Sequence, residues 1–342
     1  MKRVVVATSL FLLAVLVVAV ALNGALTVKD RAKWAAASGM LAARSGACSV
    51  LLADGRVLVT GGTNESGVLS SAELLELAGA STPAAPMAYA RAGHLCVALP
   101  DGSVLVAGGR TTGDAATNSA EIYDPALNTW RIAGAMVDAR AEATASVLPD
   151  GRVLIAGGEA SGATLASLEI YDPAAGAFTA VLQPLSSPRK GHAAAVLADG
   201  RVVIGGGSDG AAALDTVEIF DPATGEIIAA GRLTSPRTGL TATTLLDRRV
   251  FFAGGNDGEK DLATTEIYDP STGEFVAASA METARSGHIA LRIPGNNAVL
   301  IAGGTLNGEP ISSAGLYIPW RNSYEPVSYT HLRAHETGRN VV

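Results

Sequence analysis

The sequence has few aromatic residues, few charges and almost no cysteine. Of its 342 residues, 5% are aromatic, 17% are charged and only two are cysteines. With 48% hydrophobic residues, the chain is not disordered and can bury a large core. Outside the N-terminus it lacks apolar residues at the 3.6-residue period of a helix. Together with 39 glycines, these absences predict an all-β fold of short strands joined by tight turns.

Several classes of function are also excluded by what the sequence does not contain. It has no nucleophile elbow, no P-loop and no dinucleotide-binding fingerprint. The formal net charge is −7, and an acidic chain does not attract nucleic acid. We therefore expect no cofactor and no nucleic-acid partner.

An apolar run at the N-terminus predicts export. Two basic residues precede an almost unbroken apolar run from Val4 to Leu22. We interpret residues 1–22 as a signal peptide, with small residues that favour cleavage near Ala21, or as an uncleaved membrane anchor. Either case places the body outside the cytoplasm, as a secreted, periplasmic or cell-surface protein. It would touch a membrane only through residues 4–22, if these are not cleaved.

The C-terminus matches nothing else in the chain. Residues 326–342 resemble the translation of adapter DNA, and we interpret them as a non-native tail that says nothing about the fold.

A five-residue motif recurs along the chain. EIYDP occupies residues 121–125, 169–173 and 266–270, and EIFDP occupies residues 218–222. A Gly-Gly pair recurs with it, at intervals of 47 to 49 residues. The pairs begin at Gly61, Gly108, Gly157, Gly206, Gly254 and Gly303.

Each copy of the repeat reads as four strands. An apolar run such as RVLVTGG ends at the Gly-Gly pair, and in four copies it follows Asp-Gly, the dipeptide that two-residue hairpins prefer. A polar loop leads to the Glu-x-Tyr-Asp-Pro strand, which proline ends because it cannot donate a ladder hydrogen bond. A fourth strand such as TWRIAGAM follows. Four antiparallel strands in this length predict one blade of a β-propeller.

The repeat as a whole resembles kelch repeats. The resemblance rests on the Gly-Gly pair, the tyrosine of the third strand and an aromatic residue such as Trp130 or Phe275 in the fourth. It covers residues 33–319 and implies a six-bladed kelch-type β-propeller with four antiparallel strands per blade.

The two ends of the repeat region suggest how the ring closes. Residues 33–44 match a fourth strand, whereas the sixth copy lacks the Asp-Pro turn after Ile318. We therefore expect an N-terminal strand around Trp34 to complete the sixth blade and remove its open edge. A seventh blade is the alternative if the native chain continues beyond residue 320.

An arginine stands in every link from a fourth strand to the next first strand. Guanidinium groups match carboxylate, sulfate or phosphate, and in kelch propellers that bind acidic peptides, arginines at this link contact the ligand, as the resemblance implies for these positions. The alternative is structural, with each arginine paired to a third-strand glutamate such as Glu169. Gly315 replaces this glutamate in the sixth copy, so the arginine there would be freest to meet a ligand. The candidate ligand-binding residues are Arg44, Arg91, Arg140, Arg189, Arg237 and Arg285.

Histidines and cysteines also fall at related positions. His94, His192 and His288 each follow a link arginine by three residues, but they belong to different blades, so we expect no metal site. Cys48 precedes its Gly-Gly pair by 13 residues and Cys96 by 12. A one-residue offset turns strand side chains to opposite faces, so we expect no disulfide.

The repeat points to binding more than to catalysis. Its variety is concentrated in the loops after the Gly-Gly pairs, where recognition is usually placed. We expect a monomeric, non-catalytic binding module for an unidentified protein or carbohydrate ligand. The alternative is a sugar mutarotase of the exported kelch type, which would use arginines and an acid at the channel mouth on an acidic sugar. A copper oxidase resembling galactose oxidase is disfavoured, because every candidate tyrosine belongs to the repeat.

Overall fold

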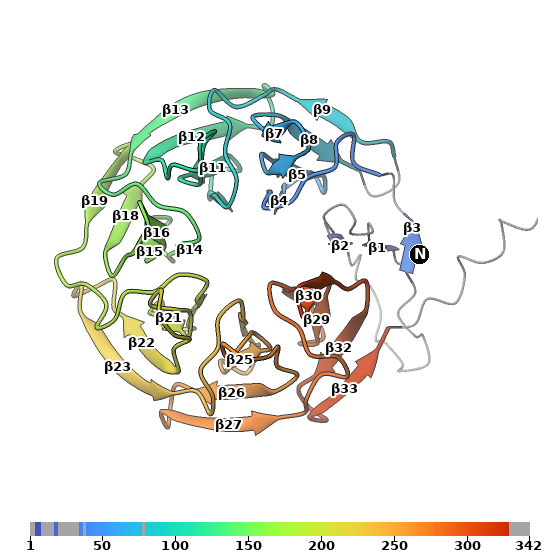
Figure 1. Ribbon diagram of the computed structural model, residues 1–342, viewed down its shortest axis with the longest axis vertical. Helices are drawn as coiled ribbons and strands as arrows, with labels where there is room; N and C mark the ends of the chain where they lie inside the picture. Colours follow the sequence, from blue (N-terminus) through green and yellow to red (C-terminus); the bar gives the residue numbers. More distant parts are fainter. Residues whose placement is uncertain (1–3, 8–16, 20–33, 37–38, 77–78, 328–342) are drawn as a thin grey trace, which may run out of the picture.

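The chain forms six blades arranged around a central axis (Figure 1). The computed structural model describes residues 4–7, 17–19, 34–36, 39–76 and 79–327. Most of the interpreted export segment, and residues 328–342 of the interpreted tail, lie outside these residues. The first two residues of that tail belong to the fold, because Pro326 pairs with Gly315 and Val327 packs against the hydrophobic cluster of Leu300. The described residues form strands and turns and no helix, and therefore include no membrane-spanning helix. The predicted fold class, all-β with six blades of four antiparallel strands, is confirmed.

Each blade is a meander in which the first strand lies nearest the axis and the fourth lies at the rim. Blade 1 contains β4 (Cys48–Leu51), β5 (Val57–Thr60), β8 (Ala72–Leu75) and β9 (Thr82–Ala84). Blade 2 contains β10 (Leu95–Ala98), β11 (Val104–Ala107), β12 (Ser119–Asp124) and β13 (Thr129–Ala135). Blade 3 contains β14 (Thr144–Val147), β15 (Val153–Ala156), β18 (Leu168–Asp172) and β19 (Ala177–Ala180).

The second half of the ring repeats this order. Blade 4 contains β20 (Ala193–Val196), β21 (Val202–Gly205), β22 (Thr216–Phe220) and β23 (Ile227–Arg232). Blade 5 contains β24 (Thr241–Thr244), β25 (Val250–Ala253), β26 (Thr265–Asp269) and β27 (Glu274–Ala278). Blade 6 contains β28 (Ile289–Arg292), β29 (Val299–Ala302), β32 (Ala314–Ile318) and β33 (Ser323–Pro326).

Three short hairpins extend from the loops after the Gly-Gly pairs. They are β6 (Thr63–Asn64) with β7 (Gly67–Val68), β16 (Glu159–Ala160) with β17 (Ala163–Thr164), and β30 (Thr305–Leu306) with β31 (Glu309–Pro310).

The hydrophobic core lies between blades, because side chains on a strand alternate between the two faces of its sheet. In blade 2, Leu105 and Ala107 pack with the second strand of blade 3, whereas Val104 and Val106 pack with Leu58 of blade 1. The same two-sided packing joins blades 3 to 4, 4 to 5 and 5 to 6. Each blade therefore depends on its neighbours for burial.

The two ends of each blade carry different features. At one end, the residue after each link arginine forms an isolated β-bridge with the residue after a Gly-Gly pair, as Ser45 does with Thr63 and Lys190 does with Ser208. We call this end the link face. The turns between first and second strands lie at the opposite end, beyond pairs such as Thr244↔Val250, and we call it the turn face.

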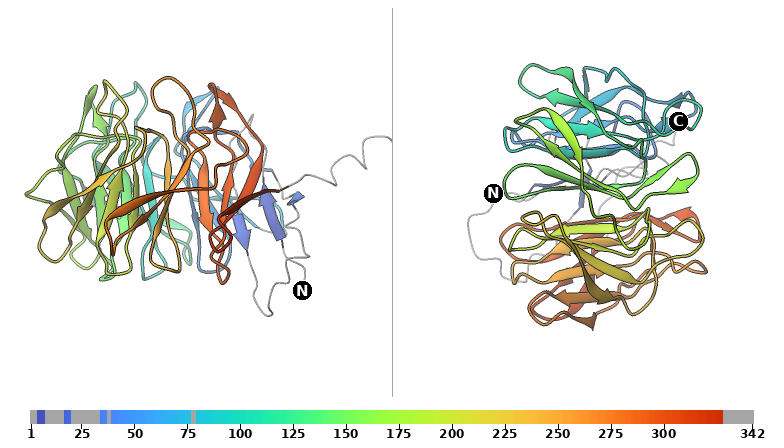
Figure 2. Two further views of the ribbon diagram at one scale, coloured as in Figure 1. Left: turned by 90° about the horizontal axis from the view of Figure 1, so that it is seen from below. Right: turned by 90° about the vertical axis from the view of Figure 1, so that its left-hand side faces the viewer.

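The expected closure by an N-terminal strand is wrong. The third strand of blade 6 pairs with β33, through Ile318↔Ser323. Strand β3 (Trp34–Ala36) instead pairs in parallel with β1 (Val4–Ala7), which also pairs with β2 (Val17–Ala19). These three strands stand between blade 6 and blade 1 (Figures 1 and 2).

Blade 6 makes its own fourth strand because a local turn replaces the missing Asp-Pro sequence. Asn322 adopts a left-handed φ of 45°, and its side-chain oxygen accepts a hydrogen bond from the Tyr317 hydroxyl at 3.2 Å. Asn128 does the same for Tyr123 in blade 2, at 2.8 Å. A short hairpin also costs less loop-closure entropy than pairing with the far end of the chain.

Candidate ligand-binding site on the link face

All six link arginines are buried. Their exposed fractions are 2% or less. In each copy, Nη1 donates to the carbonyl oxygen of the first glycine of the Gly-Gly pair, at 2.7 to 3.1 Å. Each arginine therefore fastens its link to the blade that follows. The six are Arg44, Arg91, Arg140, Arg189, Arg237 and Arg285.

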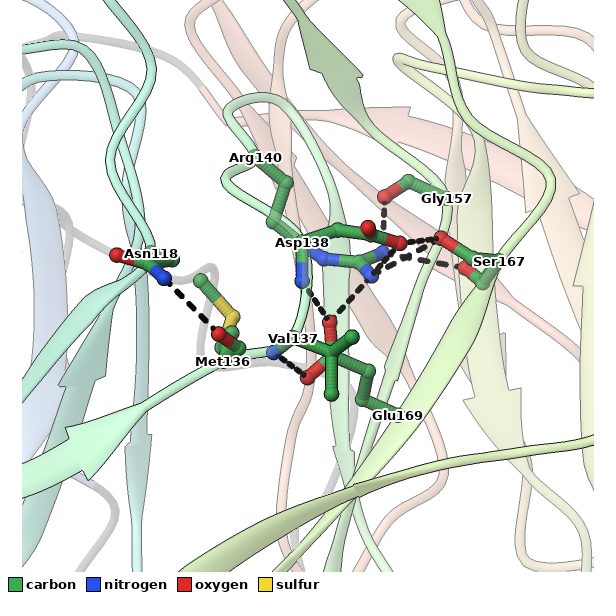
Figure 3. Close-up of polar contacts among 8 residues, drawn as sticks. All are labelled: Asn118, Met136, Val137, Asp138, Arg140, Gly157, Ser167 and Glu169. Carbon is green, nitrogen blue, oxygen red and sulfur yellow. Dashed lines mark hydrogen bonds and ion pairs between the residues drawn. The ribbon is translucent and has the colours of Figure 1, made fainter.

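Arg140 shows the full arrangement (Figure 3). Its Nη1 also donates to the Ser167 carbonyl oxygen at 3.1 Å, and its Nη2 donates to the Ser167 hydroxyl at 3.1 Å and to Glu169 at 2.7 Å. The Glu169 carboxylate accepts two further hydrogen bonds, from the backbone N–H groups of Val137 and Asp138 at 2.7 and 2.9 Å. The ion pair thus holds both ends of the incoming link.

Five of the six arginines pair with a third-strand glutamate, at 2.6 to 2.9 Å. In the sixth copy Gly315 stands in place of the glutamate, and the Tyr324 ring fills the space that a side chain there would occupy. Arg285 is 1% exposed, so it is no freer than the others, and burial lowers its pKa. The ion pair that a structural role of the arginines predicts is therefore present in five copies. The candidate site consists of other residues.

The three histidines are also part of the scaffold. Each Nε2 lies 2.8 or 2.9 Å from a threonine hydroxyl of the neighbouring blade. Burial, together with the nearby arginine, lowers their pKa to about 3, so they are neutral. Within the described part of the chain, no group of three metal-ligating side chains comes together. The histidines are His94, His192 and His288.

Cys48 and Cys96 form a disulfide, which corrects the sequence-based expectation. Their Cα atoms are 5.9 Å apart on the innermost strands of blades 1 and 2. A one-residue offset turns side chains to opposite faces when the two strands are hydrogen-bonded in one sheet. These two strands belong to different sheets, so side chains one register apart can still meet.

Charged residues that break the repeat gather on the link face of blades 2 to 4. The Glu159 carboxylate, 9% exposed, bonds the guanidinium of Arg110 through one oxygen and the ammonium of Lys190 through the other. Glu142 lies 3.7 Å from Arg110 and is 44% exposed. We call Arg110, Glu142, Glu159 and Lys190 the charged cluster. Both cations keep more than a quarter of their side-chain surface exposed, so the cluster offers charges of both signs to a ligand.

Glu142 holds a backbone conformation that favours glycine. Its φ is 56°, and the equivalent position is glycine in the other five copies, with φ between 58° and 66°. These six residues form a chain of five hydrogen bonds, called the glycine belt here, in which the N–H of every member after the first donates to the carbonyl oxygen of the preceding copy. The belt runs through Gly46, Gly93, Glu142, Gly191, Gly239 and Gly287. A left-handed non-glycine residue costs about 1–2 kcal/mol, and such strain marks functional sites more often than chance.

A protein-family model agrees with this architecture. The model described as the KLHDC2/KLHL20/DRC7 Kelch-repeats domain matches residues 75–255, more than half of the chain. The chain belongs to this Kelch-repeat family. No curated protein matches it in sequence.

A solved structure shares the Kelch propeller fold. The structure of YjhT aligns with a TM-score of 0.67 and 15% identity, over 84% of this chain and 99% of that chain. At this identity the likeness concerns the fold alone. The Kelch propeller is a scaffold that supports binding or interaction generally.

The charged cluster was not predicted from the sequence, although a signal for it exists. Residues repeated in every Kelch copy, such as the link arginines, are buried and hydrogen-bonded within the scaffold. The cluster consists of departures from the repeat: Glu142 replaces the belt glycine, and Arg110 and Glu159 follow Gly-Gly pairs where other copies have Thr, Ser or Asn. Comparing the copies for their differences would have found it.

Proposed function

We propose that this protein is a non-catalytic binding module whose link face binds a protein ligand at the charged cluster. The observation that carries the proposal is Glu142, which holds a left-handed conformation beside Arg110 where the other five copies have glycine. Glycine would serve a scaffold role at this position with less backbone strain. We therefore attribute the presence of Glu142 to its carboxylate.

The chemistry of the face favours a polar protein surface as ligand. Arg110, Glu142 and Lys190 present both signs of charge on one side of the ring. The loops after the Gly-Gly pairs are dominated by small and polar residues and contain no aromatic residue, so the face lacks the apolar anchors of a tight interface. We expect a moderate affinity that weakens as salt rises, because exposed charges are screened.

The test removes the carboxylate by restoring the repeat. In Glu142→Gly, we expect melting temperature to rise, because about 1 kcal/mol of backbone strain is relieved, while binding weakens at least tenfold. Arg248→Gly is the matched control: Arg248 has a φ of 70° where four copies have glycine, but it lies on the turn face. It should raise the melting temperature without changing binding.

Binding would be measured by calorimetry on the purified body, after screening arrays of charged peptides and of oligosaccharides. Unchanged affinity in Glu142→Gly would refute the assignment of the site, and binding of oligosaccharides alone would replace the protein ligand by a carbohydrate.

A sugar mutarotase is the second candidate, because Glu142 beside Arg110 also pairs an acid with an anion-binding group. Acceleration of anomer exchange in an acidic sugar, followed by NMR and lost in Glu142→Gln, would favour it over the binding module.

We also infer that the body folds outside the cytoplasm. The apolar N-terminal run supports export, and the Cys48–Cys96 disulfide fits an oxidising compartment. Fractionation with N-terminal sequencing tests this. A mature start near Asn23 would indicate a released protein and an intact Met1 an anchored one, whereas unprocessed soluble chain in the cytoplasm would refute export.

A further inference from the structure

The ring is open between blade 6 and blade 1. At the other five junctions, the second-strand side chains of two neighbouring blades share one hydrophobic cluster. At the sixth junction they do not. Leu300 and Ala302 of blade 6 belong to one cluster, and Val57, Val59 and Leu75 of blade 1 belong to another. Both faces have the pattern of a blade-to-blade contact, but they do not contact each other.

The glycine belt is interrupted at the same junction. Five hydrogen bonds of 2.8 to 3.3 Å link its six members in order. In a closed ring of six blades, the Gly46 N–H would complete the belt by donating to the Gly287 carbonyl oxygen. Among the hydrogen bonds of the described residues, this one is not formed. Backbone packing and side-chain packing therefore indicate the same opening.

The chain entering blade 1 is arranged as a link from a preceding blade. Leu41 and Ala42 donate backbone N–H groups to Glu73 at 2.6 and 3.1 Å, and Arg44 pairs with Glu73 at 2.6 Å. These are the contacts that Val137, Asp138 and Arg140 make with Glu169 in blade 3. In the other copies such a link leaves a fourth strand, and the strand before this one is β3, which stands in the opening with β2 nearest the axis (Figure 1).

The strands in the opening do not form a blade. β1 pairs with β3 in parallel, whereas all strand pairs within the six blades are antiparallel. At the other side of the opening, the chain leaves β33 in the same way as it leaves the fourth strand of blade 3. The Val327 N–H donates to the Ala314 carbonyl oxygen at 2.9 Å, and in blade 3 the Val181 N–H donates to the Leu168 carbonyl oxygen at the same distance. Val327 then packs against the Leu300 and Ala302 cluster of blade 6.

We propose that the opening is a docking position for three further Kelch-type strands joined to the chain after Val327, which take the place of β1 and β2 and leave β3 as the fourth strand of that seventh blade. The occupant is specified by the five existing junctions. Its second strand must present apolar side chains and its third strand an aromatic ring to Leu300, as Val250, Phe252 and Tyr268 of blade 5 do to Val203 of blade 4. Its opposite face must present a large apolar side chain to Val57 and Val59, as Phe251 of blade 5 does to Val299 and Ile301.

A grafted blade tests the proposal. Residues 328–342 of the full chain are replaced by a copy of residues 231–270, which carry the link and the first three strands of blade 5, and a scrambled copy of the same composition is the matched control. We expect the graft to raise the melting temperature by at least 5 °C and to resist proteolysis, whereas the scrambled copy does neither. Leu300→Asp, which charges the docking face, should abolish the gain in the grafted chain.

The proposal would be overturned by a graft that is cleaved as readily as its scrambled control at an unchanged melting temperature. It would also be overturned if the ungrafted chain sediments as a dimer that Leu300→Asp or Val59→Asp converts to monomer, because a second copy would then fill the opening. Neither outcome depends on the charged cluster, which lies in blades 2 to 4, so the proposed function is tested separately.

Discussion

Replacing Arg140 with alanine tests whether the link arginines stabilise the fold. The variant leaves the Glu169 carboxylate, 1% exposed, without its counter-charge, and leaves the carbonyl oxygens of Gly157 and Ser167 without their shared donor. Removing one partner of a buried ion pair typically costs about 3–5 kcal/mol. We expect a loss in this range, a large fraction of the 5–15 kcal/mol that typically stabilises a protein.

Arg285→Ala is the internal control. Arg285 donates to the carbonyl oxygens of Gly303 and Ser313, as Arg140 does in its own copy, but it has no glutamate partner. Its loss leaves only neutral acceptors, at roughly 1 kcal/mol each. We therefore expect Arg285→Ala to cost about 2 kcal/mol less than Arg140→Ala.

Both losses would be measured by urea denaturation at neutral pH, from the shift of the midpoint at constant slope. Adding Glu169→Gln to Arg140→Ala should recover at least about 1 kcal/mol, because the buried charge is removed while an acceptor for the link amides remains. Equal losses for the two arginines, or a cost below about 1 kcal/mol for Arg140→Ala, would refute the ion-pair argument.

Three further predictions concern the scaffold. Burial lowers the pKa of His192 from 6.5 to about 3, so the unfolded chain takes up a proton first as pH falls, and stability should decrease from about pH 6.5 towards pH 3. This histidine accounts for about 2–3 kcal/mol of that loss near pH 4.5, and His192→Leu should flatten the pH dependence of the melting temperature. Reducing the Cys48–Cys96 disulfide, which closes a separation of 48 residues, should cost up to about 4 kcal/mol, seen as a lower melting temperature with reductant; no change would argue that the bridge is absent. Gly61→Ala should destabilise the protein by at least about 2 kcal/mol more than Gly93→Ala in denaturant titrations. The two glycines share nearly the same φ, but only at Gly61 would an added Cβ press on a carbonyl oxygen. Equal losses would show that φ alone matters.

The sequence alone determined the blades. Strand order, turn positions and the alternation of side chains depend on residues close together in the chain, and they recur with the Gly-Gly and Glu-x-Tyr-Asp-Pro motifs. A hairpin forms from local turn chemistry and a two-residue period, so six copies of the pattern gave the correct fold class. The pairing of Arg140 with Glu169 could also be anticipated, because the two residues recur together in five copies.

Only the tertiary structure decided how the blades meet and which residues remain available to a ligand. The Cys48–Cys96 bridge and the charged cluster join side chains from different blades, and their geometry depends on how neighbouring sheets are placed, which no local pattern encodes. The expected closure by an N-terminal strand was wrong for a related reason. Residues 33–44 do resemble a fourth strand, but resemblance does not choose a partner, and blade 6 formed its edge locally through Asn322 because the short turn has the lower entropic cost.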